Sequence, residues 1–396
     1  MSAMTFLRSR RLMNGPYLAR NPVVLGMMAA SDVAGLIAPR RAAALPDRPL
    51  KVLVANLAHL GDLINTIPML TRLRASPRVA RLGVVIGEWG RPVFELGDLA
   101  DTVHIYDHWR MNRGGEGLKA KLRRHARTRA SAARAIEAEG YDVAIDTYAY
   151  FGNSASLLWS AGIPVRVGLT SGGAGTLYTH RLGFDPELSI PANQARLLAP
   201  ILGEGGASGL TAVPPPGLAP DPEVMRIADR LGNFIVFHIG PGRPEKDWLA
   251  AEWIEVGRRL TAEGFRLAFT GAGSEAAHGA AVREALGGED LAGKIGLRGF
   301  ATILSRAKGL VTIDTVTGHL AACFQTPTVV VAPGTAPINL WHPNQPYARM
   351  TTHPVPCAPC HRTHGCAEMT CLRSVKADRV YTTLREMMAA KAAAAA

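Results

Sequence analysis

The sequence predicts two doubly wound α/β domains that face each other across a cleft. Three observations predict this fold class: the length, the alternation of short apolar runs with helical patterns, and one break rich in glycine and proline. At 396 residues the chain is too long for one ordinary hydrophobic core and suits two. Short buried strands that alternate with helices are typical of parallel sheets covered by helices on both faces.

The N-terminal domain is expected over residues 50–202. Residues 51–56 form an apolar run that predicts the first strand, and Leu63, Ile67 and Leu70 then recur at helical spacing. The same rhythm predicts strands at Leu82–Ile86, Val103–Tyr106 and Val143–Asp146, and a basic helix over residues 115–139. Residues 1–49 precede this domain as a basic N-terminal extension.

A linker is expected over residues 203–230, where glycines and then Pro214–Pro216 interrupt the rhythm. The C-terminal domain is expected over residues 231–380, with its first strand at Phe234–Ile239, and residues 381–396 form an alanine-rich tail. Ligands of doubly wound domains bind at the carboxyl ends of the strands. The function is therefore expected in the cleft.

The net charge of +12 is concentrated in two segments. Residues 110–134 hold nine Lys or Arg against one acidic residue, and residues 1–49 hold seven Arg against two. Such a run is either a solvated helix face or a surface that meets an anion. No nucleic-acid module and no interleaved aromatic residues accompany it, so an anionic substrate or membrane surface is preferred to nucleic acid.

The apolar run from Pro22 to Ala30 leaves two interpretations open. It is shorter than the roughly 18 residues of a membrane span, and no small-residue cleavage site follows it. A helix that touches a membrane surface and a disordered or packing extension both fit the pattern.

The most specific segment is Val311–Pro327, in which a strand ends at Asp314 and a helix begins near Thr317. Thr315, Gly318 and His319 lie at the start of this helix, where amides and hydroxyls form an anion site. Seen alone, the segment is better interpreted as an ordinary capped helix with His319 packed.

Three further strand ends in the same domain favour a nucleotide-diphosphate pocket. One leads through Pro241 and Gly242 to Lys246 and Trp248. Another leads through Gly271 and Gly273 to Glu275, and the last ends at Val331–Pro337.

In this ordered set the sequence resembles glycosyltransferase family 9, the ADP-heptose:lipopolysaccharide heptosyltransferases. The resemblance covers about residues 50–380 and is carried by Leu60-Gly61-Asp62, Lys246-Asp247-Trp248, Asp314-Thr315 with His319, and Pro333–Pro337. It implies the GT-B fold, inversion at the anomeric carbon and no catalytic metal.

The resemblance also implies residue roles. Asp62 would be the general base that deprotonates the acceptor hydroxyl, and Lys246 would neutralise the departing diphosphate. The donor would be bound by these residues: Pro241, Gly242, Lys246, Gly271, Glu275, Asp314, Thr315, Gly318 and His319. Apart from the resemblance, the basic charge of residues 110–134 predicts that an anionic acceptor would meet Arg110, Arg113, Lys119, Arg123 and Arg124.

Two positions depart from the family pattern and concern specificity more than reaction class. Asn56 stands where members often carry a basic residue, and Val316 stands where a glycine commonly follows the Asp-Thr pair.

Four cysteines lie within fifteen residues: Cys357, Cys360, Cys366 and Cys371. Four thiolates suit tetrahedral zinc or iron, and some relatives that glycosylate autotransporters hold iron in a comparable insertion. A reduced, metal-free loop and a disulfide are the alternatives. A structural metal here would have no part in catalysis.

These features together predict transfer of a heptose from ADP-heptose to a lipopolysaccharide core, in the cytoplasm at the inner face of the inner membrane. Three alternatives remain: another nucleotide sugar or a protein or polysaccharide acceptor, a non-catalytic nucleotide-sugar-binding protein, and a sugar epimerase of the same fold.

Overall fold

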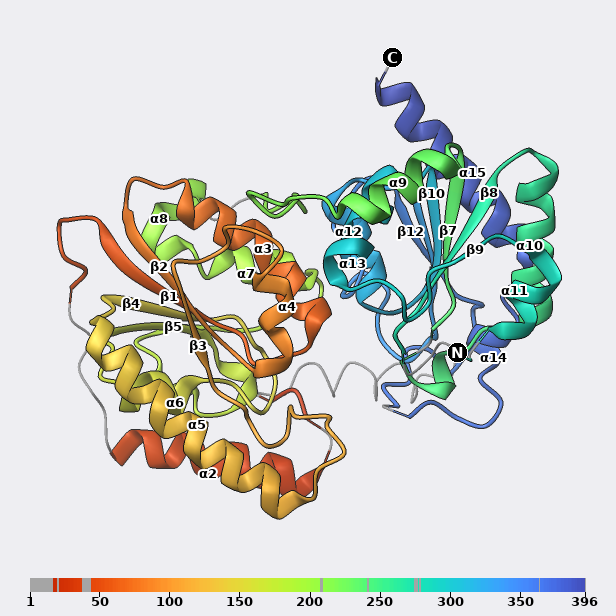
Figure 1. The fold of residues 1–396 in the computed structure, drawn as a ribbon. Coiled ribbons are helices and arrows are strands. Elements are labelled where there is room, and N and C mark those ends of the chain that lie inside the picture. Colours follow the sequence, from red (N-terminus) through yellow and green to blue (C-terminus); the bar gives the residue numbers. More distant parts are fainter. Residues whose placement is uncertain are drawn as a thin grey trace. The chain divides into compact units, whose positions relative to one another are not determined.

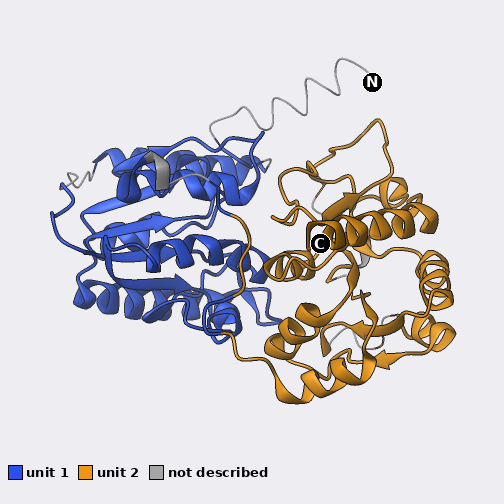
Figure 2. Ribbon diagram, turned by 90° about the horizontal axis from the view of Figure 1, so that it is seen from above, with its two compact units in different colours: residues 1–210, 215–217 blue, residues 211–214, 218–396 orange. Residues whose placement is uncertain are grey.

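The computed structural model describes residues 17–19, 21–37, 44–206, 209–240, 242–273, 277, 279–362 and 364–395. The chain divides into two compact units, which Figure 2 colours separately. Unit 1 comprises residues 1–210 and 215–217, and unit 2 comprises residues 211–214 and 218–396.

Unit 1 is built on a six-stranded parallel sheet in the order β3-β2-β1-β4-β5-β6. Its strands are β1 (Leu50–Ala55), β2 (Val79–Ile86), β3 (Thr102–Ile105), β4 (Val143–Asp146), β5 (Val165–Leu169) and β6 (His180–Leu182). Its helices are α2 (Pro22–Ile37), α3 (Leu60–Arg74), α4 (Arg91–Phe94), α5 (Leu118–Glu139), α6 (Ala155–Ser160), α7 (Ile190–Arg196) and α8 (Ala199–Gly206), with short 3-10 turns η1 (Glu88–Gly90), η2 (Thr170–Gly172) and η3 (Gly175–Leu177). In Figure 1, α3 and α7 cover one face of the sheet and α5 and α6 the other.

Unit 2 repeats the plan with the strand order β12-β11-β10-β7-β8-β9, again parallel. Its strands are β7 (Phe234–His238), β8 (Arg266–Thr270), β9 (Glu289–Asp290), β10 (Gly309–Ile313), β11 (Thr328–Val331) and β12 (Ala348–Thr351). Its helices are α9 (Pro222–Leu231), η4 (Pro244–Lys246), α10 (Ala250–Ala262), α11 (Ala280–Leu286), α12 (Leu297–Arg306), α13 (Val316–Cys323), α14 (Thr370–Arg373) and α15 (Ala377–Ala395).

The two cores explain why the strands read as continuous apolar runs. In unit 2, Phe237 and Phe269 from adjacent strands pack edge-to-face with Trp253 of α10 beside them. In unit 1, Leu53 and Ala144 on neighbouring strands are fully buried, as expected for a sheet covered on both faces.

Two segments differ from the boundaries that composition suggested. The predicted linker, 203–230, contains helix α9, because Asp221 caps it by accepting from the amides of Glu223 and Val224 at 3.0 and 3.2 Å. Residues 381–395 of the predicted tail belong to α15, whose Leu384 and Met387 are buried in unit 2. Composition indicated neither helix, because the Asp221 cap of α9 and the buried face of α15 each depend on a few positions and not on the average content of the segment.

Candidate active site

Asp62 lies at the carboxyl end of β1, in the first turn of α3. Its Oδ2 accepts a hydrogen bond from the His59 amide at 3.3 Å, which closes a capping box at the start of the helix. The buried Asn56 side chain holds the connecting loop, since its Oδ1 accepts from the Ala58 amide at 3.0 Å and its Nδ2 donates to the Asp62 carbonyl at 3.5 Å. The local sequence therefore fixes the position of this carboxylate.

Asp62 lines a small pocket that is partly open to solvent. Its lining is Asn56, Asp62, Thr147, Tyr148, Ala149, Tyr150, Leu169, Phe184, Ile190, Asn193 and Gln194, all from unit 1. Three aromatic rings form one wall, with centroid separations of 5.6 Å between Tyr148 and Tyr150 and 6.4 Å between Tyr150 and Phe184. Such a wall suits the apolar face of a sugar ring.

Gln194 adds a polar group to this pocket. The side chain is 1% exposed, and its Oε1 has no hydrogen-bond partner among the described residues. A buried acceptor without a partner costs free energy. A ligand hydroxyl that donates to it would remove that cost.

Burial raises the pKa of Asp62 to about 6. The His59 amide and the positive charge of Arg113 act in the opposite direction and limit the rise. A carboxyl with this pKa is mostly ionised at neutral pH and yet basic enough to accept a proton. Burial also raises the pKa of Tyr148 and Tyr150, so both phenols stay neutral beside it.

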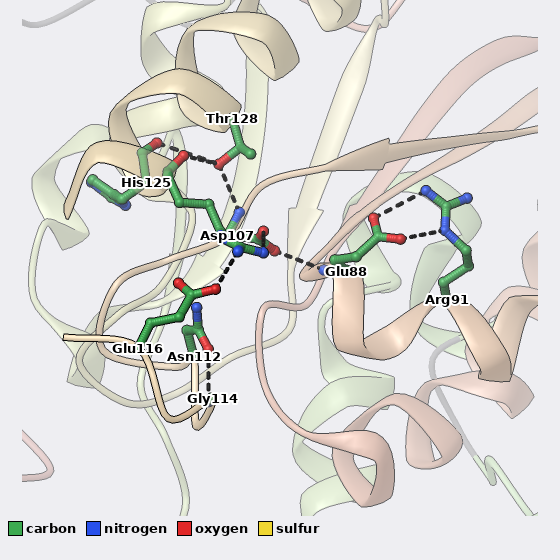
Figure 3. Close-up of polar contacts among 9 residues, drawn as sticks. Glu88, Arg91, Asp107, Asn112, Gly114, Glu116, His125 and Thr128 are labelled. Carbon is green, nitrogen blue, oxygen red and sulfur yellow. Dashed lines mark hydrogen bonds and ion pairs between the residues drawn. The ribbon is translucent and has the colours of Figure 1, made fainter. Parts of the chain in front are cut away.

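The loop between β3 and α5 is held by Asp107, as Figure 3 shows. Asp107 Oδ1 accepts from the Glu88 amide at 2.8 Å, and the Asp107 amide donates to Thr128 Oγ1 at 3.0 Å. Arg124 pairs with Glu116 and lies 3.9 Å from Asp107 Oδ2. Arg124, predicted to bind an acceptor, therefore makes its described contacts within this loop.

The other predicted acceptor residues fall into two groups. Arg110 and Arg113 are exposed in the loop, and their charges reach the pocket, since both lower the pKa of Tyr148 and Arg113 also lowers that of Asp62. Lys119 and Arg123 lie on the exposed side of α5.

In unit 2, Lys246 and Asp314 meet at the ends of η4 and β10. Lys246 Nζ donates to Asp314 Oδ2 at 2.7 Å and to the Asp314 carbonyl at 2.8 Å. These bonds use two of the three N–H donors of the ammonium group. Both side chains keep about a quarter of their surface exposed, 28% and 27%, so the pair remains accessible to a ligand.

Thr315 caps α13, since its Oγ1 accepts from the Thr317 amide at 3.4 Å. A Cβ on Gly318 would lie 3.2 Å from both Pro343 and Val330. A side chain at Gly318 would therefore be tightly packed. The first-turn amides of α13 are the groups that the helix offers an anion, although the Thr317 amide already donates to Thr315.

His319 is 7% exposed, and its Nδ1 has no hydrogen-bond partner in the described part of the chain. Burial lowers its pKa to about 4, against the opposing effect of Asp314. The imidazole is therefore neutral at pH 7 and acts as a hydrogen-bonding group rather than as a cation.

The remaining donor residues are only partly described. Gly242 has a φ of 62°, which favours glycine, and Gly271 accepts from the Gly293 amide at 2.9 Å where β8 ends. Pro241 and Glu275 lie outside the described residues. Trp248 belongs to the core and anchors the Lys246 loop, since its Nε1 donates to the Val375 carbonyl at 2.9 Å.

The cysteine loop, residues 357–371, packs against two of these segments. The Cys360 amide donates to the Gly334 carbonyl at 3.1 Å, and a Cβ on Gly334 would lie 2.9 Å from Ala358. On its other side, His364 lies 3.9 Å from Glu245 of η4. The loop therefore supports both the turn after β11 and the segment that carries Lys246.

Burial is the largest cause that raises the pKa of Cys371. The nearby thiols of Cys360, Cys366 and Cys357 raise it further, so the four cysteines lie near one another. No three His, Cys, Asp or Glu side chains within the described ranges are placed so that they could hold a metal ion. The predicted zinc or iron ligand set is therefore not assembled as the thiols stand, and no chemical step is assigned to it.

Sequence reasoning missed the aromatic wall and Gln194. Tyr148 and Tyr150 follow directly after β4, which pairs with β1. Their position after this strand could have indicated from the sequence that they lie near Asp62. Phe184 and Gln194 come from a segment whose return to this edge only the fold reveals.

Comparisons with known proteins identify relatives. The model for "Glycosyltransferase family 9 (heptosyltransferase)" matches residues 129–369, more than half of the chain. Lipopolysaccharide heptosyltransferase 1 of Pseudomonas aeruginosa is 27% identical over 331 residues, 78% of this chain and 86% of that protein.

Two solved structures have a similar fold. The glycosyl transferase family 9 protein from Veillonella parvula has 18% identity and a TM-score of 0.67, over 88% of this chain and 99% of its own. The E. coli heptosyltransferase WaaC with ADP has 22% identity and a TM-score of 0.63, over 85% and 100%. With the two parallel sheets, these likenesses confirm the predicted GT-B fold class.

Replacing Asp62 by asparagine should stabilise the protein at pH 8. The pKa of about 6 lies above the ordinary aspartate value of 3.8, so the folded state favours the protonated form and loses stability as pH rises through 6. Asparagine carries no charge and should gain about 1–2 kcal/mol at pH 8, after allowance for partial exposure. The gain should shrink towards zero by pH 4.

Thermal unfolding of both proteins from pH 4 to 8 measures this difference. Asp47→Asn, at a fully exposed side chain, is the matched control and should change little. An Asp62→Asn gain that did not depend on pH would contradict the buried carboxylate.

Proposed function

Because the chain belongs to glycosyltransferase family 9, we propose that it moves a heptose from ADP-heptose to an anionic lipopolysaccharide core acceptor. The family makes the chain a glycosyltransferase enzyme. The named relative of Pseudomonas aeruginosa and the WaaC structure with ADP support heptose and ADP as the donor chemistry. The proposal also includes inversion at the anomeric carbon and no catalytic metal.

The observation that carries the proposal is the Asp62 carboxylate in its aromatic pocket. With a pKa of about 6, Asp62 can receive the proton of an acceptor hydroxyl while that oxygen forms a bond to the anomeric carbon. The bond from this carbon to the diphosphate oxygen breaks in the same step, and the diphosphate leaves with the electron pair. One direct displacement inverts the configuration.

Unit 2 supplies the charge stabilisation in this proposal. The third N–H of Lys246 and the first-turn amides of α13 are directed to the diphosphate as negative charge grows on it. Thr315 and the neutral His319 complete the donor site with hydrogen bonds. These groups take the place that a divalent cation has in metal-dependent transferases.

Unit 1 supplies the acceptor site. A sugar ring would stack on Tyr148, Tyr150 and Phe184, and one of its hydroxyls would donate to Gln194 Oε1. Arg110 and Arg113 would bind acidic groups of the acceptor, with Lys119 and Arg123 further along α5. We place the reaction at the cytoplasmic side of the inner membrane.

Asp62→Asn should keep donor affinity and lose turnover. Removing a general base typically lowers a rate by about 10²–10⁴-fold. The test measures binding of ADP-heptose, GDP-mannose and UDP-N-acetylglucosamine by calorimetry and transfer by mass spectrometry. In the wild type, turnover should rise with pH through about 6 and then level off, since only the carboxylate accepts a proton.

Other results identify the alternatives. If another nucleotide sugar binds more tightly than ADP-heptose, that sugar is the donor. Tight binding without transfer to any acceptor would indicate a non-catalytic binding protein. Free sugar released from the donor in the absence of acceptor would indicate an epimerase.

Lys246→Ala should lower kcat with ADP-heptose by about 10²–10³-fold, the range seen when one transition-state donor is removed. The Asp314 carboxylate would also lose the partner that holds it at 2.7 Å. Lys246→Arg keeps the charge and should retain part of the rate. Equal rates in all three proteins would remove Lys246 from the mechanism.

Tyr150→Ala should raise the acceptor KM about tenfold, since an aromatic contact contributes about 0.5–1.5 kcal/mol beyond its buried area. Tyr150→Phe keeps the ring and is the matched control. Donor affinity should stay unchanged in both variants. A raised donor Kd with an unchanged acceptor KM would contradict the acceptor pocket.

A further inference from the structure

Helix α2 is apolar on both of its faces. Ser31 and Asp32 are its polar side chains, and every other residue from Pro22 to Ile37 is apolar or glycine. A helix without a polar face is normally buried on all sides. The helix precedes the residues that match the family, 129–369.

The inner face fixes α2 firmly to unit 1. Val24, Met28 and Gly35 are buried at helical spacing. Asp32 Oδ1 accepts from the Thr176 amide at 3.0 Å, and Ser31 Oγ accepts from the Ala174 amide at 2.8 Å. Both polar side chains of the helix are therefore used on the inner face.

The outer face is left to solvent with no polar group. Its large side chains are exposed by 70% at Val23, 44% at Met27, 58% at Val33, 63% at Leu36 and 81% at Ile37. Gly26, Ala29, Ala30 and Ala34 fill the spaces between them and are also exposed. A continuous apolar surface of this kind marks an interaction site.

Basic residues flank α2 in the sequence and lie on the exposed side of α5, and they indicate the chemistry of a partner for this face. In the sequence, Arg20 stands before the helix, and Arg40 and Arg41 stand after it. Helix α5 runs along the same lower side of unit 1 in Figure 1. It exposes Leu118 (59%) and Leu122 (44%) beside the exposed Lys119 and Arg123.

Apolar side chains bordered by Lys and Arg match the surface of an anionic bilayer. The apolar groups enter the boundary between headgroups and acyl chains, and the cations meet the lipid phosphates. A protein partner would be expected to offer hydrogen bonds, and this face has no side chain to accept or donate one.

We propose that the outer face of α2 docks on an anionic lipid surface, with the helix lying in the plane of the interface. Among the described helices, none is both long enough and apolar enough to cross a membrane. The inference concerns membrane attachment and is measured without enzymatic activity, so its outcome is independent of the proposed transfer reaction.

The test measures binding of the full chain to vesicles of phosphatidylglycerol with phosphatidylethanolamine, and to phosphatidylcholine vesicles, by flotation. The wild type should bind the anionic vesicles, and high salt should weaken binding. Val33→Glu with Ile37→Glu should lower the partition at least about tenfold, because it removes apolar contact and adds repulsion. Donor binding should not change.

The matched control is Ala389→Glu with Ala390→Glu, which adds the same charge at exposed positions of α15. It should bind vesicles like the wild type. Circular dichroism and the unfolding midpoint check that both variants fold. If the double glutamate variant fails to fold, Val33→Ser with Ile37→Ser should give a smaller loss of binding in the same direction.

Three results would overturn the proposal. One is equal vesicle binding by the wild type and the Val33→Glu, Ile37→Glu variant. Another is a wild type that binds neither vesicle, including after deletion of residues 1–16. The third is a dimer, seen by light scattering, that the double glutamate variant dissociates while vesicle binding stays absent, since a second copy would then cover the face.

Discussion

Parallel strand pairing is the constraint on which the Asp62 pocket of unit 1 and the Lys246–Asp314 pair of unit 2 each depend. Since all strands of a sheet run in one direction, their carboxyl ends share one edge, and the loops that follow them must be neighbours. In unit 1, Ala55 pairs with Asp146, which places the Asp62 loop beside Tyr148. In unit 2, His238 pairs with Thr312, which places the Lys246 loop beside Asp314. Contacts between residues far apart in sequence follow from this register.

A second buried carboxylate, that of Asp146, holds the loops at the carboxyl edge of the unit 1 sheet in place. Asp146 is fully buried, accepts from the Tyr178 hydroxyl at 2.9 Å and accepts from the Tyr148 amide at 3.2 Å. Burial raises its pKa to about 6, as for Asp62. The two aspartates nevertheless differ in use. The carboxylate oxygens of Asp146 accept hydrogen bonds from the protein and so orient the aromatic wall. The Asp62 carboxylate lines the pocket.

Much of this arrangement was predictable from sequence, and the failures have physical causes. The strand rhythm predicted both sheets, and the pairing of a basic η4 residue with Asp314 agrees with the expectation that these strand ends meet. Gly318 was predicted to bind the donor, and the structure adds that a Cβ there would lie 3.2 Å from both Pro343 and Val330. Arg124 was predicted from its charge to bind an acceptor, and in the structure Glu116 and Asp107 lie next to it. Charge in a sequence does not reveal which partner the fold supplies, and Phe184 and Gln194 depend on a return of the chain that local patterns do not encode.

The cysteine loop offers an optical reporter of the donor site. Cys357 is exposed, whereas burial raises the pKa of Cys371 and raises that of Cys323 to about 12. A thiol reacts as its thiolate and only where a reagent can reach it. A fluorophore attached under mild conditions should therefore enter at Cys357 first. The loop packs against Gly334 and lies beside Glu245. The emission of a fluorophore on Cys357 would therefore report movements of the segment that carries Lys246 when a nucleotide binds or dissociates.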